Sequence, residues 1–364
     1  MTMPKRRNLL AVLGAAAVIV TGIVVLFAAS SCGCARGHRA AGPAARQGAV
    51  SRRSRSRVVA SAGTAAQQTT GCAPAVGQTM TNTVSHLCGF ADTTNTGVPG
   101  GTTLFPASSG PSANTGSGWA YSGGEIKTTA NGAVIKNVTC SCGVNVTNTG
   151  VTIEDSDLQV SGADSYVVAL LHADNTTVEH DNLHGSGTAV GQGCDSAVRD
   201  IYADADGLTV ENNNVWYCAD PMNNIADGGL IEENYFHDLE PSTSGNHYED
   251  IQLEQGNGSV MTIQDNTFLN QNSQTAAIIL SNDNGSGDET NRVINHNLLA
   301  GGGYTFYGAG GSGTPSNHIT FTNNSFSPMY RADSGYYGPV AYWTTSTNTW
   351  SNNIWDTNGT AVGS

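Results

Sequence analysis

The sequence predicts an all-β fold, a right-handed parallel β-helix (solenoid) of about ten coils. The first observation is a phrase of eight residues, Val151-Thr-Ile-Glu-Asp-Ser-Asp-Leu158 in its first copy, whose central apolar residue returns at intervals of 21 to 32 residues. A period of about 20 to 50 residues is typical of repeat architectures. Within each copy apolar and polar residues alternate, as a strand with one buried face requires. Nothing between the copies has helical periodicity, which argues against ankyrin, tetratricopeptide and leucine-rich repeats.

The copies follow one another along the chain with recognisable centres, which we expect to stack in the core. These centres are Ile153, Val178, Val210, Ile231, Ile263, Ile294, Phe321 and Trp350. In every full copy an Asn, Asp or Ser follows the centre by three places, namely Ser156, Asp181, Asn213, Asn234, Asn266 and Asn324. Because these residue types tolerate left-handed backbone and bond to their own main chain, they mark a bend. Stacked at one height, they could also hydrogen-bond from coil to coil.

The first seventy residues have a different composition. Lys5, Arg6 and Arg7 precede an uncharged apolar run over 9–29, which is long enough to span a bilayer. Residues 1–32 could be a cleaved signal peptide, an uncleaved signal anchor or a segment lipidated at Cys32. Residues 33–70 predict a disordered basic linker, and residues 71–364 form the β-helix domain. In each case we expect an extracellular or cell-surface protein, secreted or tethered, that meets the membrane only through its N-terminal segment.

The charge is divided unevenly between these parts. Residues 1–70 hold 10 of the 15 basic side chains and no Asp or Glu, which leaves 5 basic and 29 acidic groups, a formal charge of −24, on residues 71–364. Such a surface excludes nucleic acid as a partner. It would also repel a polyanionic polysaccharide unless Ca²⁺ intervened. We expect a monomer whose partner is a polysaccharide.

The cysteines test the alignment of the coils. Cys194 lies seven residues before Ile201, and Cys218 lies seven residues before Ile225. If the two isoleucines are equivalent core positions, the cysteines stack about 4.8 Å apart, within the range of a disulfide. We therefore predict a Cys194–Cys218 disulfide, and a Cys72–Cys88 disulfide that closes a cap loop.

The same alignment predicts a polar face. With Ile201, Ile225 and Ile251 in the core, their neighbours point outward. One outward column contains Asp200, Asn224 and Asp250, its partner contains Tyr202 and Gln252, and Arg199 and Glu249 stand at the strand starts.

This face allows two kinds of catalysis. Asp200 and Asp250 would lie about 10 Å apart, two coils away from each other, near the upper end of the roughly 6.5–9.5 Å expected for an inverting glycosidase. Alternatively, Asp200, Glu249, Asp250 and Glu254 would bind Ca²⁺. The metal would acidify the α-proton of a uronate, and a base would then remove it. The candidate bases are Arg199, Lys127, Lys136, Arg292, Arg331, His247 and His237.

Three segments carry a resemblance to known proteins. They are Gly89-Phe-Ala-Asp-Thr-Thr-Asn-Thr-Gly-Val-Pro-Gly-Gly-Thr-Thr-Leu104, His247-Tyr-Glu-Asp-Ile-Gln252 and Gly301-Gly-Gly-Tyr-Thr-Phe-Tyr307. They resemble exported actinobacterial β-helix-repeat proteins, and the coils with their Asn-bearing turn resemble the right-handed pectate-lyase-like superfamily. The resemblance implies a polysaccharide-active or glycan-binding surface protein. Glu249 and Asp250 replace the Asp-Gly of that pattern, which changes the reach of the carboxylate.

The predicted function is pectate-lyase-like cleavage of a cell-wall or extracellular polysaccharide. The alternatives are an inverting glycoside hydrolase and a non-catalytic glycan-binding solenoid. His247, Glu249 and Gln252 are the central site residues, and His237 and Asp238 are a second candidate pair. Aromatic faces that could stack on sugar rings are Tyr304, Tyr307, Tyr336, Tyr337 and Trp343.

Overall fold

The computed structural model describes residues 87, 89–162, 165–240, 247–254, 256–281, 289–309, 316–344 and 347–364. All of them belong to one compact unit, Ser61–Ser364. The predicted segments 1–32 and 33–70 lie outside the described residues. Within the described ranges the chain is all-β, with one 3-10 helix, η1 (Ala107–Ser109), and no helix long and apolar enough to cross a bilayer.

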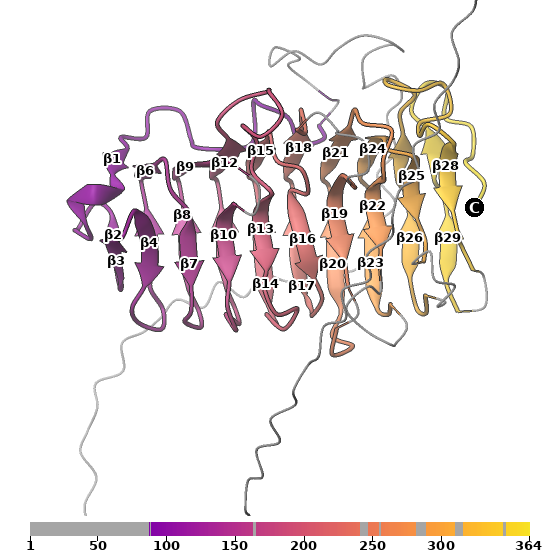
Figure 1. Cartoon of the computed structure of the whole chain (residues 1–364). Helices are drawn as coiled ribbons and strands as arrows, with labels where there is room; N and C mark the ends of the chain where they lie inside the picture. Colours follow the sequence, from indigo (N-terminus) through magenta and orange to yellow (C-terminus); the bar gives the residue numbers. More distant parts are fainter. Residues whose placement is uncertain are drawn as a thin grey trace, which may run out of the picture. The chain divides into compact units, whose positions relative to one another are not determined.

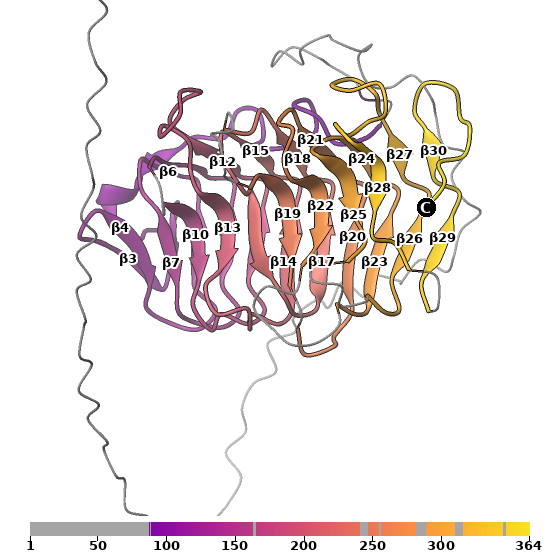
Figure 2. The same cartoon turned by 45° about the vertical axis from the view of Figure 1, so that its right-hand side comes forward.

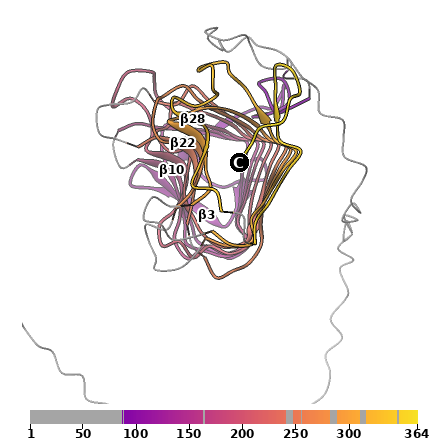
Figure 3. The ribbon, with the colours of Figure 1, turned by 90° about the vertical axis from the view of Figure 1, so that its right-hand side faces the viewer.

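The described residues form a parallel β-solenoid, which confirms the predicted fold class (Figure 1). Successive coils each give one strand to each of three sheets of ten strands. Seen along the stack, the coils superimpose around one interior (Figure 3). Strand β3 pairs antiparallel with β4, and β2 with β5, while the remaining pairs between strands are parallel.

The bounds of the strands are as follows. Sheet 1 contains β3 (Trp119–Ser122), β4 (Glu125–Thr128), β7 (Val144–Val146), β10 (Tyr166–Leu170), β13 (Ser196–Asp200), β16 (Met222–Ile225), β19 (Glu249–Leu253), β22 (Ala276–Leu280), β25 (Tyr304–Tyr307) and β28 (Gly338–Ala341). Sheet 2 contains β2 (Gly116–Ser117), β5 (Val134–Lys136), β8 (Thr152–Glu154), β11 (Thr177–Glu179), β14 (Leu208–Glu211), β17 (Gly229–Glu232), β20 (Met261–Gln264), β23 (Arg292–Asn295), β26 (Thr320–Thr322) and β29 (Thr349–Ser351). Sheet 3 contains β1 (Phe105–Pro106), β6 (Val138–Cys140), β9 (Asp157–Val160), β12 (Asn182–Gly185), β15 (Asn214–Trp216), β18 (Tyr235–His237), β21 (Thr267–Asn270), β24 (Leu298–Gly301), β27 (Ser325–Phe326) and β30 (Ile354–Trp355).

The repeated phrase supplies a strand of sheet 2, a turn and a strand of sheet 3. Its central residues pair in register from coil to coil, from Ile153 through Val178 and Val210 to Trp350. Those from Ile153 to Phe321 are fully buried. The predicted stacking of the centres is therefore confirmed, and it fixes the register of sheets 2 and 3.

The predicted polar ladder at the turn is also confirmed. The Nδ2 of Asn213 donates to Asn234 Oδ1 at 2.9 Å, and Asn234 continues to Asn266 at 3.0 Å. Side-chain bonds of 3.0–3.1 Å extend the series through Asn297 and Asn324 to Asn353. Each of these side chains is almost fully buried, so the ladder satisfies amides that would otherwise be costly to enclose.

A segment at the start of the described chain runs along the outside of sheet 3, and we call residues 89–104 the strap (Figure 2). Phe90 and Ala91 pack with Leu298 and Met329 of late coils. Farther on, the Gly97 amide donates to the Asn212 carbonyl at 2.8 Å. The strap then joins β1, which pairs with β6 of an early coil. It therefore crosses sheet 3 against the order of the coils.

Candidate functional site

The outer face of sheet 1 is defined by the register of five neighbouring strands, β13, β16, β19, β22 and β25. The inward column runs from Val198 through Met222 and Ile251 to Ile278 and Phe306. The next position along each strand faces outward. It is occupied in turn by Arg199, Asn223, Gln252, Ile279 and Tyr307.

The predicted alignment of Ile201, Ile225 and Ile251 is wrong. Ile201 lies beyond the end of β13 and is half-buried, and Ile225 pairs with Leu253. Strand β16 contains an irregularity between Met222 and Ile225, where Asn224 adopts a φ of 63°. An extra residue in one strand displaces its neighbours from the simple alternation.

Asp200 does not face outward, which corrects its predicted place. It is 1% exposed, and its carboxylate accepts the Ala205 amide at 2.8 Å and the Tyr202 amide at 3.2 Å. Asn224 is enclosed in the same turn, where its Nδ2 donates to the Asp200 carbonyl at 2.5 Å. Burial raises the pKa of Asp200, and these amide bonds partly oppose the shift. Asp200 therefore shapes a turn.

Asp250 is also turned away from solvent, contrary to the prediction. It is fully buried, and neither carboxyl oxygen has a hydrogen-bond partner among the described residues. The flanking pairs, Glu249 with Ala276 and Ile251 with Ile278, place it beside Ala277 of the core. Burial, followed by the nearby charge of Asp220, raises the pKa of Asp250 well above its usual value. Burial therefore favours the protonated form of Asp250 and keeps the residue inaccessible to substrate.

A different carboxyl pair is present on the outer face. Asp220 accepts the Glu249 amide at 3.0 Å and is also hydrogen-bonded to the Glu249 side chain. Glu249 is 3% exposed. Burial raises the pKa of Asp220 to about 6, and the hydrogen bonds to Glu249 limit that rise. Groups that hold a proton near pH 6 are suited to acid–base chemistry.

A third carboxylate lies one coil before this pair. Asp195 forms an ion pair of 3.2 Å with Arg199, and its carbonyl accepts the Asp220 amide at 2.9 Å. The Arg199 guanidinium also lies 5.1 Å from the centre of the Tyr166 ring. Asp195, Asp220 and Glu249 thus come from consecutive coils.

Amide side chains continue the polar face. Asn223 Nδ2 donates to Gln252 Oε1 at 3.2 Å and lies 3.3 Å from Asp220 Oδ2. Gln252 in turn donates to Glu254 Oε1 at 2.7 Å. This connected network orients the groups around the pair.

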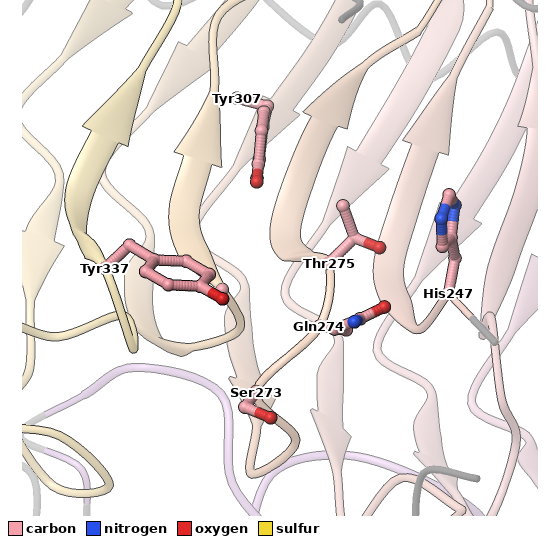
Figure 4. Close-up of a pocket in the computed structure, with 7 residues that line it drawn as sticks. His247, Ser273, Gln274, Thr275, Tyr307 and Tyr337 are labelled. Atoms are coloured by element: carbon pink, nitrogen blue, oxygen red, sulfur yellow. The ribbon is translucent and has the colours of Figure 1, made fainter. Parts of the chain in front are cut away.

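A pocket of about 230 Å³ opens beside β19, β22 and β25 (Figure 4). It is lined by His247, Ser273, Gln274, Thr275, Gly303, Tyr307 and Tyr337. His247, predicted from the sequence, is exposed here. Burial, with smaller effects of neighbouring tyrosines and of Glu249, raises the pKa of Tyr307 to about 12. The Tyr307 hydroxyl is therefore neutral and can donate to a ligand.

The carboxylates predicted to hold Ca²⁺ do not come together as one set. Glu254 lies beyond the end of β19, where its carbonyl accepts Arg292 at 2.8 Å, while Asp200 and Asp250 are buried in the places described above. Within the described ranges, no group of three or more His, Cys, Asp or Glu residues is arranged to hold a metal ion.

Three other predicted site residues lie elsewhere. Tyr202 is exposed on the turn after β13 and stacks on His172 with ring centres 4.2 Å apart. His237 is buried on sheet 3, where it bonds to Asp238 at 2.7 Å and to Asn214 at 2.9 Å. His237 and Asp238 therefore form a structural pair on a different sheet from His247.

The Cys194–Cys218 disulfide is confirmed, with a Cα separation of 4.3 Å. Cys140 and Cys142, whose pairing the sequence left open, form a second disulfide. The predicted Cys72–Cys88 disulfide lies outside the described residues.

The chain is thus a parallel β-solenoid with a carboxyl-bearing outer face on one sheet. No protein-family model, curated protein or solved structure matches it. The resemblance to the pectate-lyase-like superfamily therefore stays a prediction.

Proposed function

We propose that this protein hydrolyses an uncharged extracellular polysaccharide on the outer face of sheet 1. The observation that carries the proposal is the Asp220–Glu249 pair, in which Asp220 holds a proton up to about pH 6. A protonated carboxyl at the surface of a binding face can act as a general acid on a glycosidic oxygen.

Asp195 is the partner base in this proposal. Glu249, which is hydrogen-bonded to Asp220, is the group that delivers the shared proton. Asp195 lies two coils from Glu249, which corresponds to about 10 Å from the strand spacing, near the upper end of the roughly 6.5–9.5 Å used by inverting glycosidases. A water between them would attack the anomeric carbon from one face. The acid would give its proton to the leaving oxygen on the other face, and Asp195 would take the proton of the water.

The charge of the site favours an uncharged substrate. A third acidic group, Asp195, lies next to the Asp220–Glu249 pair, and the nearby basic group among the described residues, Arg199, is already paired with Asp195. A polyuronate would be repelled by this surface. The extracellular location is supported by the two disulfides, because such bonds persist in oxidising compartments.

A screen of neutral and uronic polysaccharides tests the proposal with the full chain, read by reducing-end release and by the absorbance of unsaturated uronides. We expect reducing ends without an unsaturated product, and loss of at least about a hundredfold in kcat for Asp220→Asn and for Glu249→Gln. The Asp265→Asn variant is the matched control, because that carboxylate is part-exposed and pairs with His296 on the turn between sheets 2 and 3.

The pH profile gives a second readout. Because the acid must be protonated, kcat/KM should fall as the pH rises through about 6. If an unsaturated product forms and its formation stops when chelator is added, the proposed hydrolysis is wrong. The reaction would then be the calcium-dependent elimination that the sequence also predicts. Binding without any cleavage would leave a glycan-binding solenoid.

A further inference from the structure

Five tyrosines cluster at the C-terminal end of sheet 1, and we call them the tyrosine platform: Tyr304, Tyr307, Tyr336, Tyr337 and Tyr342. Ring centres of neighbouring members lie 4.8 to 5.7 Å apart. Tyr336, Tyr337 and Tyr342 are 58%, 66% and 58% exposed. Contiguous exposed apolar surface is a feature of ligand-binding and interaction sites.

The platform is not needed to close the end of the solenoid. Trp343, Trp350 and Trp355 pack against the hydrophobic core there, and Phe321 stacks on Trp350 with ring centres 4.7 Å apart. None of the five tyrosines belongs to either core cluster. The exposed members, Tyr336, Tyr337 and Tyr342, therefore offer ring faces that a ligand can contact.

The pocket beside the platform has a rigid backbone wall. The Thr275 amide donates to the Tyr248 carbonyl at 2.6 Å, Gly303 donates to Thr275 at 2.9 Å, and Tyr337 donates to Gly303 at 2.7 Å. A wall that is hydrogen-bonded before binding loses little entropy when a ligand enters.

Among the described residues the pocket is lined by the His247 imidazole and otherwise by hydroxyl, amide and aromatic groups, without a carboxylate, a lysine or an arginine. Its volume of about 230 Å³ is below the roughly 300–1,000 Å³ of pockets for drug-sized ligands. The size and the chemistry fit a single sugar ring with apolar faces and hydroxyl edges.

The position of the platform relates it to the carboxyl pair. Strand β25 lies two coils after β19, and β28 lies three coils after it. These separations correspond to about 10 and 14 Å. Because a sugar unit advances a polysaccharide by roughly one coil spacing, about 5 Å, the platform would hold units two to three places from the bond that is cut.

We propose that the tyrosine platform and its pocket bind an uncharged glycan two to three sugar units from the Asp220–Glu249 pair, with the glycan chain lying along the solenoid axis. The direction of the chain relative to the scissile bond rests on the proposed function. Binding at the platform does not. Ligands of four or more units should bind more tightly than disaccharides, because only the longer ligands reach from the tyrosine platform to the Asp220–Glu249 pair.

The test uses the full chain with Glu249→Gln, so that binding is measured without cleavage. The probes are uncharged β-1,4-linked gluco-, xylo- and manno-oligosaccharides of two to six units, with oligogalacturonates as charged counterparts, titrated by calorimetry. We expect at least one neutral series to bind, with affinity rising up to four units. Tyr307→Ala and Tyr337→Ala should each weaken it about three- to tenfold. Tyr121→Ala, a part-exposed tyrosine on β3, is the matched control and should leave affinity unchanged.

Unchanged affinity in both platform variants would overturn the proposal, as would preference for the charged probes or failure of every probe to bind. The two proposals fail separately. If binding depends on the tyrosines but the natural protein never cleaves a glycan, the proposed hydrolysis is wrong and the proposed binding at the platform stands. If the protein cleaves a glycan and the tyrosine variants cleave it equally well, the platform proposal is wrong and the proposed hydrolysis stands.

Discussion

Replacing Asp181 by Asn should stabilise the solenoid, because Asp181 is the carboxylate in a ladder otherwise built mainly from asparagines. Its Oδ1 accepts the Ser156 amide at 2.6 Å, but its Oδ2 is buried and has no hydrogen-bond partner in the described part of the chain. In the neighbouring coil, the Asn213 Nδ2 occupies the equivalent position and donates to the Val178 carbonyl at 2.9 Å and to Asn234 Oδ1 at 2.9 Å. An Asn at 181 would make the corresponding two bonds, to the Ile153 carbonyl and to Asn213 Oδ1.

The magnitude follows from those two bonds. Each buried hydrogen bond adds about 0.5–1.5 kcal/mol net, and an unsatisfied buried acceptor costs about 1–3 kcal/mol. Because the two quantities describe the same atoms, they are not summed. We expect Asp181→Asn to raise the free energy of unfolding by about 1–3 kcal/mol at pH 7.

The stabilisation of the folded state by Asp181→Asn should become smaller as the pH falls. Burial raises the pKa of Asp181 well above its usual value, so the folded state retains a proton that the unfolded state loses near pH 3.9. Stability of the natural protein is therefore fullest below that pH and falls as the pH rises toward the folded pKa. The Asn variant lacks this loss, so its advantage should shrink toward pH 4.

Urea unfolding followed by circular dichroism at several pH values between 4 and 8 measures both effects. Asn213→Asp is the matched control, since it places the same carboxyl one coil later and should cost about 1–3 kcal/mol at neutral pH. A destabilised Asp181→Asn protein, or a gain that does not vary with pH, would refute this account of the ladder.

Three further changes test other parts of the fold by the same unfolding assay. Replacing Cys194 and Cys218 together by Ser removes a cross-link over 24 residues and should cost about 3 kcal/mol; if wild type and variant unfold alike without reductant, the cross-link contributes nothing. Arg292→Ala should cost about 3–5 kcal/mol, since it removes the buried partner of Glu289 and the donor to the Ala226 and Glu254 carbonyls; a loss below about 1 kcal/mol would contradict this. Gly302→Ala should lower the free energy of unfolding more than Gly123→Ala does. Both glycines have positive φ, but only at Gly302 would the new Cβ lie 2.7 Å from the Ala276 Cα. Equal losses of stability would show that backbone strain alone matters.

Sheets 2 and 3 could be predicted from the sequence because the repeated phrase contains their strands and the turn between them. Alternation placed Ile153 and its equivalents inside, and the residue three places later identified the ladder. Sheet 1 lies outside the phrase. Its alignment was inferred from isolated isoleucines, and the irregularity at Asn224 shifted that alignment.

Glu249 was named from the sequence, but its partners Asp220 and Asp195 were missed for the same reason, although one signal was available. Asp195 directly follows Cys194, and Asp220 follows Cys218 by two places. Because the disulfide stacks these cysteines, it also brings the two aspartates into consecutive coils, as their backbone bond of 2.9 Å shows. His247, Tyr307 and Tyr337, which line the pocket, were named from the sequence. That they converge on one pocket could not be predicted, because the wall between them consists of backbone contacts between loops of different coils.

The strap also connects coils of the solenoid that are not neighbours. A solenoid whose coils touch only their neighbours can fray from either end, since each contact is local. Here Phe90 stacks on His296 with ring centres 4.9 Å apart, although the strap leads directly into the earliest coil. This contact links early and late coils, so opening of the late coils also costs contacts with the strap. It also sets an order of events, because a segment made early in synthesis can dock only after the coils around Leu298 and Met329 exist.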